Sequence, residues 1–396
     1  MIGFDEALRR LCAAARPIGA EEVPIGRAAG RVLAKPVSAA IRAPASDVST
    51  MDGYAVREAD LARLPARLAV TGESLPGHPP PLSLESGQCM RIFTGAALPR
   101  GADRVVIQEV VRRDGATAEM TGPLDKARFV RRAGSDFEAG DVLVAAGTLL
   151  GPRSLVAAAA ADVARLSVWR RPLVWIVGTG DELAEPGSAR DRPGAIPDSI
   201  SHALAAMAEQ WGARVSGRTL IADDLPRLEA AAGEAVAAAD LVVVTGGASV
   251  GERDHAKRMF GAAGLDLLFS KVAIKPGKPV WLGRAGAALV LGLPGNPTSA
   301  LVTARLFLAP LLCGMTGRDP AAALAWRQAV LGEAVAANGD RETFARGTVV
   351  DGEVRLLANQ DSGSQSSLAL ADLLVRRPIG AEAMGRGAEI QILDFQ

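Results

Sequence analysis

Residues 241–254 read LVVVTGGASVGERD, an apolar run that leads directly into a glycine-rich turn with polar side chains. Residues 173–182, LVWIVGTGDE, follow the same pattern and end in two carboxylates. Between these stretches, residues 201–211 and 225–238 have the length and composition of helices. Short apolar runs that alternate with helices indicate a parallel sheet covered on both faces. We therefore predict a doubly wound, mostly parallel α/β domain over residues 172–320.

The chain on either side of this domain has other patterns. Residues 1–35 begin with apolar side chains at helix spacing, and residues 36–150 contain short apolar segments broken by glycine and proline. A proline near its start marks a helix over residues 152–166, and Asp351-Gly352 is a hairpin signal. We predict three further regions: a helical and mixed N-terminal region (1–50 and 137–171), a β-rich inserted region (51–136) and a small, barrel-like C-terminal all-β domain (321–396).

The composition restricts the class of protein. A chain of 396 residues is too long for one core, and its balance of 44 basic and 44 acidic side chains argues against nucleic-acid binding. Cys12, Cys89 and Cys313 lack the spacing of a metal site or a disulfide framework, so we expect reduced cysteines in a cytoplasmic protein. The N-terminus does not resemble a signal peptide, and no run reaches about 18 apolar residues, so we predict no membrane association.

Carboxylates follow three of the predicted strands. Asp181 and Glu182 follow the first strand, Asp224 follows the second and Asp254 follows the third. Ligands of parallel sheets bind beyond the carboxyl ends of the strands, and oxygen donors without neighbouring His or Cys suit Mg²⁺. Any one of these acids alone is more often a helix cap or a solvated charge. As a set, they predict a magnesium site for a substrate that carries phosphates.

Other residues of this domain are suited to binding anions. Gly246 and Gly247 allow backbone N–H groups to approach an anion closely, and Ser249 lies beside them. Lys275 and Lys278 are separated only by a Pro-Gly turn, so their ammonium groups can hold one phosphate or oxyanion. We expect both groups of residues to contact an anionic ligand.

Residues 294–297, PGNP, follow another apolar strand. Asn296 is a favourable helix N-cap and Pro297 a favourable first helical residue. The exposed N–H groups of such a helix can bind an anion, and we expect Pro294 to belong to the same loop of the site.

Three further motifs lie before the α/β domain. They are STMDGYAV with Asp52, RIFTGA with Thr94, and RRAGSD with Arg131 and Asp136. By composition alone each is an ordinary turn.

Taken in order, the motifs resemble those of the molybdopterin molybdenumtransferase family, which includes the C-terminal domain of gephyrin. The matching blocks cover nearly the whole chain: STMDGYAV, RIFTGA, RRAGSD, GTGDEL, TGGASVGERD, AIKPGKP and GLPGNPTSA. The resemblance implies a transferase of molybdenum cofactor biosynthesis that uses Mg²⁺ or a similar ion. It would combine adenylyl-molybdopterin with molybdate, form molybdenum cofactor and release AMP.

The resemblance also implies an elongated homodimer whose active site lies between the α/β domain of one subunit and the Asp52 region of the other. Product would pass to molybdoenzymes or their chaperones. Catalysis would involve Asp52, Thr94, Asp136, Asp181, Glu182, Lys275 and Lys278. Substrate would contact Arg131, Asp198, Gly246, Gly247, Ser249, Pro294, Asn296 and Pro297. The metal would be held by Asp181, Glu182, Asp224 and Asp254.

Two other functions remain open from the sequence. A molybdopterin adenylyltransferase would have a similar α/β domain, but it would need neither residues 36–150 nor the β tail. A non-enzymatic molybdopterin-binding scaffold would not need the acids and lysines. The segment SGSQSS (362–367) resembles a shortened form of a Gly-Ser-rich family segment, which leaves open whether one of its serines contacts the pterin.

Overall fold

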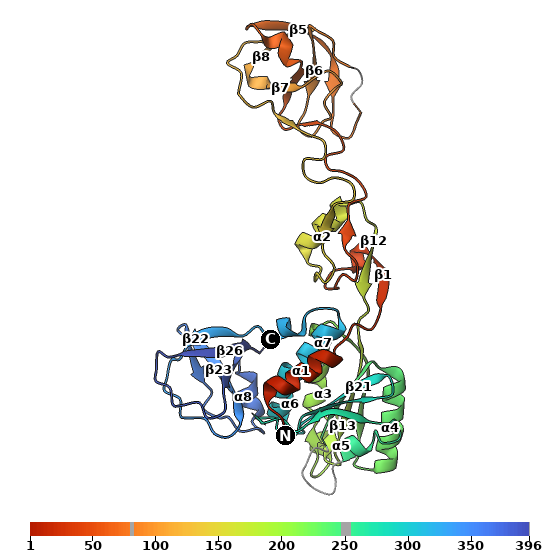
Figure 1. Ribbon diagram of the computed structural model, residues 1–396, viewed down its shortest axis with the longest axis vertical. Coiled ribbons are helices and arrows are strands. Elements are labelled where there is room, and N and C mark those ends of the chain that lie inside the picture. Colours follow the sequence, from red (N-terminus) through yellow and green to blue (C-terminus); the bar gives the residue numbers. More distant parts are fainter. Residues whose placement is uncertain (80–82, 247–254, 396) are drawn as a thin grey trace.

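The computed structural model describes residues 1–79, 83–246 and 255–395. The molecule is elongated (Figure 1), with a β-rich region at one end. At the other end an α/β region and a C-terminal β region lie side by side, and a small middle region connects the two ends.

The α/β region is built on a mixed six-stranded sheet. The strand order is β16 (Arg214–Ile221), β13 (Leu173–Thr179), β17 (Leu241–Thr245), β21 (Ala288–Leu293), β20 (Trp281–Ala285) and β18 (Asp266–Ser270). The first four strands are parallel, as predicted. β20 runs antiparallel to them, and β18, which pairs antiparallel with β20, runs in the same direction as the first four. The domain is therefore α/β with a mixed sheet.

Helices cover both faces of this sheet. Leu241 and Val243 of β17 share a core with α3 (Ile200–Gln210), whereas Val242 and Val244 share another core with α4 (Leu225–Ala238). Since successive strand residues point to opposite faces, a strand buried on both sides must be apolar throughout. This explains why the strand appears in the sequence as a continuous apolar run.

One long helix crosses the core next to this sheet. It consists of α6 (Pro297–Thr303), a π-helical turn (Ala304–Leu308) and α7 (Ala309–Met315). Within the described residues, only this helix is long and apolar enough to cross a membrane, and the tested window is entirely buried in the protein. Its buried Arg305 donates hydrogen bonds to the carbonyls of Ala323 (2.7 Å) and Asp394 (2.9 Å), and burial lowers its pKa to about 10.

The first helix, α1 (Phe4–Ala14), packs against this core helix rather than against the middle region. The Phe4 ring lies 5.7 Å from that of Phe307 and 4.9 Å from that of Phe344, which belongs to the C-terminal region. Leu11 is also buried, and Leu8 and Cys12 are partly buried, as the helical spacing predicts. The N-terminus therefore helps to join the α/β and C-terminal regions.

The middle region contains short antiparallel pairs and α2 (Pro152–Ala160). The predicted helix over 152–166 was too long, because Asp162 has a positive φ of 59° and the chain then forms β12. The pairs are β1 (Ala20–Pro24) with β12 (Arg165–Trp169) and β2 (Val37–Ser38) with β11 (Val142–Val144). A third pair, β3 (Val48–Ser49) with β10 (Val130–Arg131), packs against the distal β-rich region.

The distal region and the C-terminal region are each built on a β-sheet. The distal sheet has the order β7 (Arg104–Ile107), β4 (Gly53–Val56), β6 (Gln88–Ile92), β5 (Ala66–Ser74), β9 (Thr117–Met120) and β8 (Val111–Asp114). The C-terminal sheet has the order β19 (Ile274–Lys275), β23 (Glu342–Val350), β25 (Leu373–Arg377), β26 (Glu389–Asp394) and β22 (Arg327–Val330), and β24 (Glu353–Leu356) pairs with β23. The predicted Asp351-Gly352 hairpin connects β23 and β24, and both turn residues have positive φ.

Candidate active site

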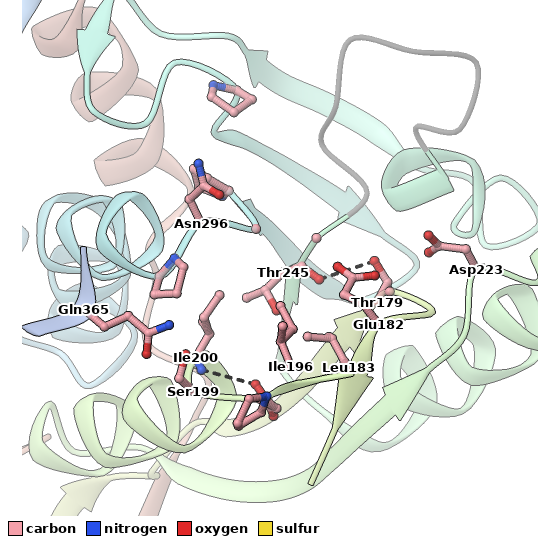
Figure 2. A pocket seen from close by; sticks show the side chains of 18 residues that line it. Thr179, Glu182, Leu183, Ile196, Ser199, Ile200, Asp223, Thr245, Asn296 and Gln365 are labelled. Atoms are coloured by element: carbon pink, nitrogen blue, oxygen red, sulfur yellow. Dashed lines mark hydrogen bonds between the residues drawn. The ribbon is translucent and has the colours of Figure 1, made fainter. Parts of the chain in front are cut away.

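A pocket of about 460 Å³ opens at the carboxyl ends of β13 and β17 (Figure 2). One side is polar and includes Thr179, Glu182, Asp223 and Thr245. Other lining residues come from the loops after β15 (Ile196–Pro197) and β21 and from α8 (Gln365–Ala369) of the C-terminal region. The predicted residues that line it are Glu182, Asp198, Gly246, Pro294, Asn296 and Pro297.

The predicted metal ligands have different environments. Glu182 lines the pocket, whereas Asp181 accepts a hydrogen bond from the backbone N–H of Asp223 (2.9 Å) and thereby connects two strand-end loops. Asp224 caps α4 by accepting from the N–H of Arg227 (3.0 Å), and it is Asp223 that lines the pocket. Across residues 1–79, 83–246 and 255–395, no cluster of three His, Cys, Asp or Glu side chains has the geometry of a metal site. Asp254 lies outside the described residues, as do Gly247 and Ser249.

Asp198 fixes the start of α3. Its carboxylate, only 2% exposed, accepts hydrogen bonds from the N–H groups of Ile200 (3.2 Å) and Ser201 (3.1 Å). It also accepts from the guanidinium of Arg218 (3.2 Å). These bonds hold the adjoining apolar side of the pocket, which consists of Leu183, Ile196, Pro197 and Ile200.

The turn that carries Lys275 and Lys278 is fixed by two contacts, one with the C-terminal sheet and one with α6. Lys275 lies in β19, which pairs with β23 of the C-terminal sheet, and Lys278 immediately precedes Pro279 of the pocket lining. Both lysines are exposed. Gly277 has a φ of 104°, and a Cβ there would lie 2.1 Å from Cγ2 of Thr303. The turn therefore packs so closely on α6 that only glycine fits.

The loop after β21 reaches both β17 and the C-terminal region. α6 begins at Pro297 as predicted, but the Asn296 side chain, instead of capping this helix, donates to Oγ of Ser362 (3.0 Å). Gly246 has a φ of 92°, and a Cβ there would lie 2.2 Å from the Thr179 carbonyl oxygen. This glycine allows the loops after β13 and β17 to meet at the bottom of the pocket.

The second group of predicted residues lies away from the pocket, within and next to the distal β-rich region. Asp52 Oδ1 accepts hydrogen bonds from the backbone N–H (2.8 Å) and the hydroxyl (2.9 Å) of Thr94. These two bonds, with the nearby Arg91 charge, hold the pKa of Asp52 below its ordinary value. Arg131 pairs with β3 through β10, and the Asp136 N–H donates to the Ala43 carbonyl (3.1 Å).

The structure thus brings Asp52 and Thr94 together, but this region and the pocket lie at opposite ends of the elongated chain (Figure 1). Within one chain the two groups of predicted site residues do not meet.

Three family models match the chain in succession. They describe the MoeA N-terminal region (domain I and II) at residues 2–161, a probable molybdopterin binding domain at 175–313 and the MoeA C-terminal region (domain IV) at 328–395. A molybdopterin molybdenumtransferase from Nostoc sp. is 33% identical over 95% of this chain and 88% of its own length. The chain belongs to the MoeA family of molybdopterin molybdenumtransferases.

Other MoeA relatives also match most of this chain. The molybdopterin molybdenumtransferase of Haemophilus influenzae is 37% identical over 76% of this chain and 74% of its own length. The solved structure of the molybdopterin biosynthesis MoeA protein from Pyrococcus horikoshii has a TM-score of 0.89 and 30% identity, and the match covers 100% of this chain and 99% of that one. The family resemblance of the seven motifs is therefore confirmed, and the fold is the MoeA fold.

Several pocket residues of this MoeA chain were not predicted from the sequence. The sequence indicated Asp224 as a metal ligand instead of its neighbour Asp223. Which of two adjacent acids faces the pocket cannot be decided without knowing that α4 begins at Leu225 and uses Asp224 as its cap. Thr179 and Thr245 lie within the GTGDEL and TGGASVGERD motifs but were not assigned to the site, and the apolar residue Ile196 belongs to none of the motifs. Gln365 lies in the shortened Gly-Ser segment, which the sequence singled out without assigning it to the pocket.

Proposed function

We propose that the chain inserts molybdate into adenylyl-molybdopterin, which forms molybdenum cofactor and releases AMP. The observation that carries the proposal is the pocket at the strand ends of the region matched by the molybdopterin-binding model. Three acids, a glycine turn and the start of α6 line this pocket, and the two-lysine turn adjoins it. Fixed cations and N–H dipoles can stabilise a substrate that carries a diphosphate, dithiolene sulfurs and the molybdate dianion.

We further propose that Mg²⁺ occupies the polar side of the pocket. The donors there are carboxylate and hydroxyl oxygens, the chemistry that Mg²⁺ prefers. Glu182 and Asp181, together with Asp254, would hold the ion. When bound, it offsets the negative charge between the phosphates and molybdate. Lys275 and Lys278 would hold phosphate or oxyanion oxygens on the other side, and the backbone N–H groups near Gly246 and Asn296 would orient them.

The distance between the two groups of site residues supports a shared site. We propose a homodimer in which Asp52 and Thr94, with Arg131 and Asp136, complete the pocket of the partner subunit. In a cytoplasmic setting the product would then pass to molybdoenzymes or their chaperones.

The test is molybdate insertion in vitro, in which purified protein receives adenylyl-molybdopterin and molybdate and AMP release is followed against added Mg²⁺. We expect AMP release that requires both molybdate and the divalent ion. Robust consumption of ATP with molybdopterin would instead indicate an adenylyltransferase. Binding of molybdopterin without either reaction would indicate a scaffold.

A further inference from the structure

A second, smaller cavity lies at the junction between the middle region and the α/β region. Its volume is about 140 Å³, and among the described residues it shares no lining residue with the candidate active-site pocket. The middle region contributes Arg31, Trp169 and Arg171. The α/β region contributes Trp211, directly after α3, and Arg318, in the turn after α7. The cavity, here called the junction cavity, therefore belongs to both regions.

Two contacts fix the middle region on the α/β region beside the junction cavity. Gly317 has a φ of 85°, and a Cβ there would lie 2.0 Å from Cδ1 of Trp169. The turn after α7 therefore packs directly on the end of β12, and Figure 1 shows this joint between the two elements. Arg170, the next residue, donates to both carboxylate oxygens of Asp240, at 2.8 and 3.1 Å. The walls of the cavity are thus part of the joint itself.

The charged side chains that line the junction cavity within the described chain are all arginines. Nη2 of Arg31, a residue 8% exposed, donates to Oε1 of Glu21 (2.5 Å) and to the Trp169 carbonyl (2.8 Å). Arg171 and Arg318 form no ion pair with an acid of residues 1–79, 83–246 or 255–395. Like charges around one small space repel one another, and an anion between them removes this repulsion.

Trp211 orients the guanidinium of Arg318. The Arg318 Cζ lies 5.1 Å from the centroid of the Trp211 ring, and the Arg305 Cζ lies 5.4 Å from the same centroid. Arg305 uses its N–H groups on two carbonyls, whereas Arg318 lies against the Cys313 thiol and its side chain donates to no oxygen of the described residues. A guanidinium stacked on an aromatic ring keeps the N–H groups at its edge available for an anion.

We propose that the junction cavity is a binding site for a compact oxyanion of the phosphate or sulfate type. Arginine forks match the oxygens of such an anion, and the tryptophan rings supply apolar walls. A cavity of about 140 Å³ lies below the range of about 300–1,000 Å³ of sites for larger ligands, so it suits a free oxyanion rather than a nucleotide. Because the anion contacts both regions, its binding stabilises their relative orientation and thereby the position of the distal region.

The experiment titrates inorganic phosphate into the full-length protein and measures binding by calorimetry. Every sample carries Lys275→Met and Lys278→Met, so that the two-lysine turn of the active-site pocket does not contribute. We expect one phosphate per chain, and we expect sulfate to compete with it. Arg318→Met should weaken phosphate binding about tenfold or more, because it removes charge-assisted hydrogen bonds.

Arg214→Met is the matched control. Arg214 is an exposed arginine at the start of β16 that does not line the cavity, so this variant removes the same charge close to the joint. Its phosphate affinity should stay within about twofold of the starting protein, because an exposed, distant charge is screened by salt. Arg171→Glu changes an exposed residue and keeps the test decisive if Arg318→Met does not fold. We expect it to abolish phosphate binding at the junction cavity.

AMP is the comparison ligand, since it carries a phosphate on a nucleoside. It should displace phosphate from the junction cavity less readily than sulfate does. Displacement by AMP at lower concentrations than by sulfate would assign the cavity to a nucleotide and overturn the inference. Absence of phosphate binding, or equal affinities in Arg318→Met, Arg171→Glu and Arg214→Met, would overturn it as well.

Discussion

The pocket of the α/β region and the Asp52–Thr94 contact of the distal region are built in different ways. The pocket collects residues from the ends of β13, β17 and β21 and from the C-terminal α8. The distal contact consists of one acid and one threonine joined by two hydrogen bonds on an exposed surface. A pocket with several walls can bind a ligand within one chain, whereas an exposed pair of residues needs another surface to form a site.

The largest predicted effect is on activity, and it comes from a substitution on the polar side of the pocket. We predict that Glu182→Gln lowers molybdate insertion by about two orders of magnitude or more, because a neutral amide cannot balance a divalent ion. The melting temperature should hardly change, since Glu182 is exposed. Glu209→Gln, an exposed acid at the end of α3, is the control and should retain activity. Equal activities of the two variants would remove Glu182 from the site.

A smaller effect, on stability, should distinguish two acids near the pocket. Asp198→Ala leaves Arg218 and the start of α3 without their buried partner, so we predict a loss of about 3 kcal/mol in the free energy of unfolding. Asp224→Ala removes only an exposed helix cap, which is worth about 1 kcal/mol. Urea denaturation measures both values. A larger loss for Asp224→Ala would contradict the assigned contacts.

Gly277→Ala tests the turn that carries the lysines. The added methyl meets Thr303, and the φ of 104° disfavours any L-residue, so we predict destabilisation of about 2 kcal/mol. Gly339→Ala, where a Cβ meets no atom within 4 Å, is the control. Thermal unfolding of both variants checks the prediction, and equal melting temperatures would show that the turn is not packed as described.

The smallest effect should occur in the distal region. Thr94→Val removes a hydroxyl that donates to Asp52, so the pKa of Asp52 should rise toward its ordinary value. A carboxyl whose folded-state pKa is lowered stabilises the fold above its ordinary pKa and loses this contribution as pH falls through the lowered value. The stability difference between wild type and variant should therefore be present at neutral pH and disappear in acid. NMR titration of the Asp52 carboxyl measures the shift, and an unchanged pKa would refute the contact.

The sequence predicted the parallel part of the fold because burial on both faces requires continuous apolar strands. It did not predict that β20 runs antiparallel to the other strands of the sheet, since an apolar run carries no direction. Within the pocket, residues in local motifs such as Asn296 could be predicted. Gln365 could not, because its place in the pocket depends on the C-terminal region packing against α6, a contact between residues far apart in the chain.

The most direct test of the shared site mixes two inactive variants, Asp52→Asn and Glu182→Gln. If Asp52 completes the pocket of the partner subunit, a mixed dimer contains one site with both defects and one intact site. Equal mixing with subunit exchange should then restore about a quarter of the wild-type insertion activity. Activity that stays at the level of either variant alone, in mixtures shown to contain mixed dimers, would contradict the shared site.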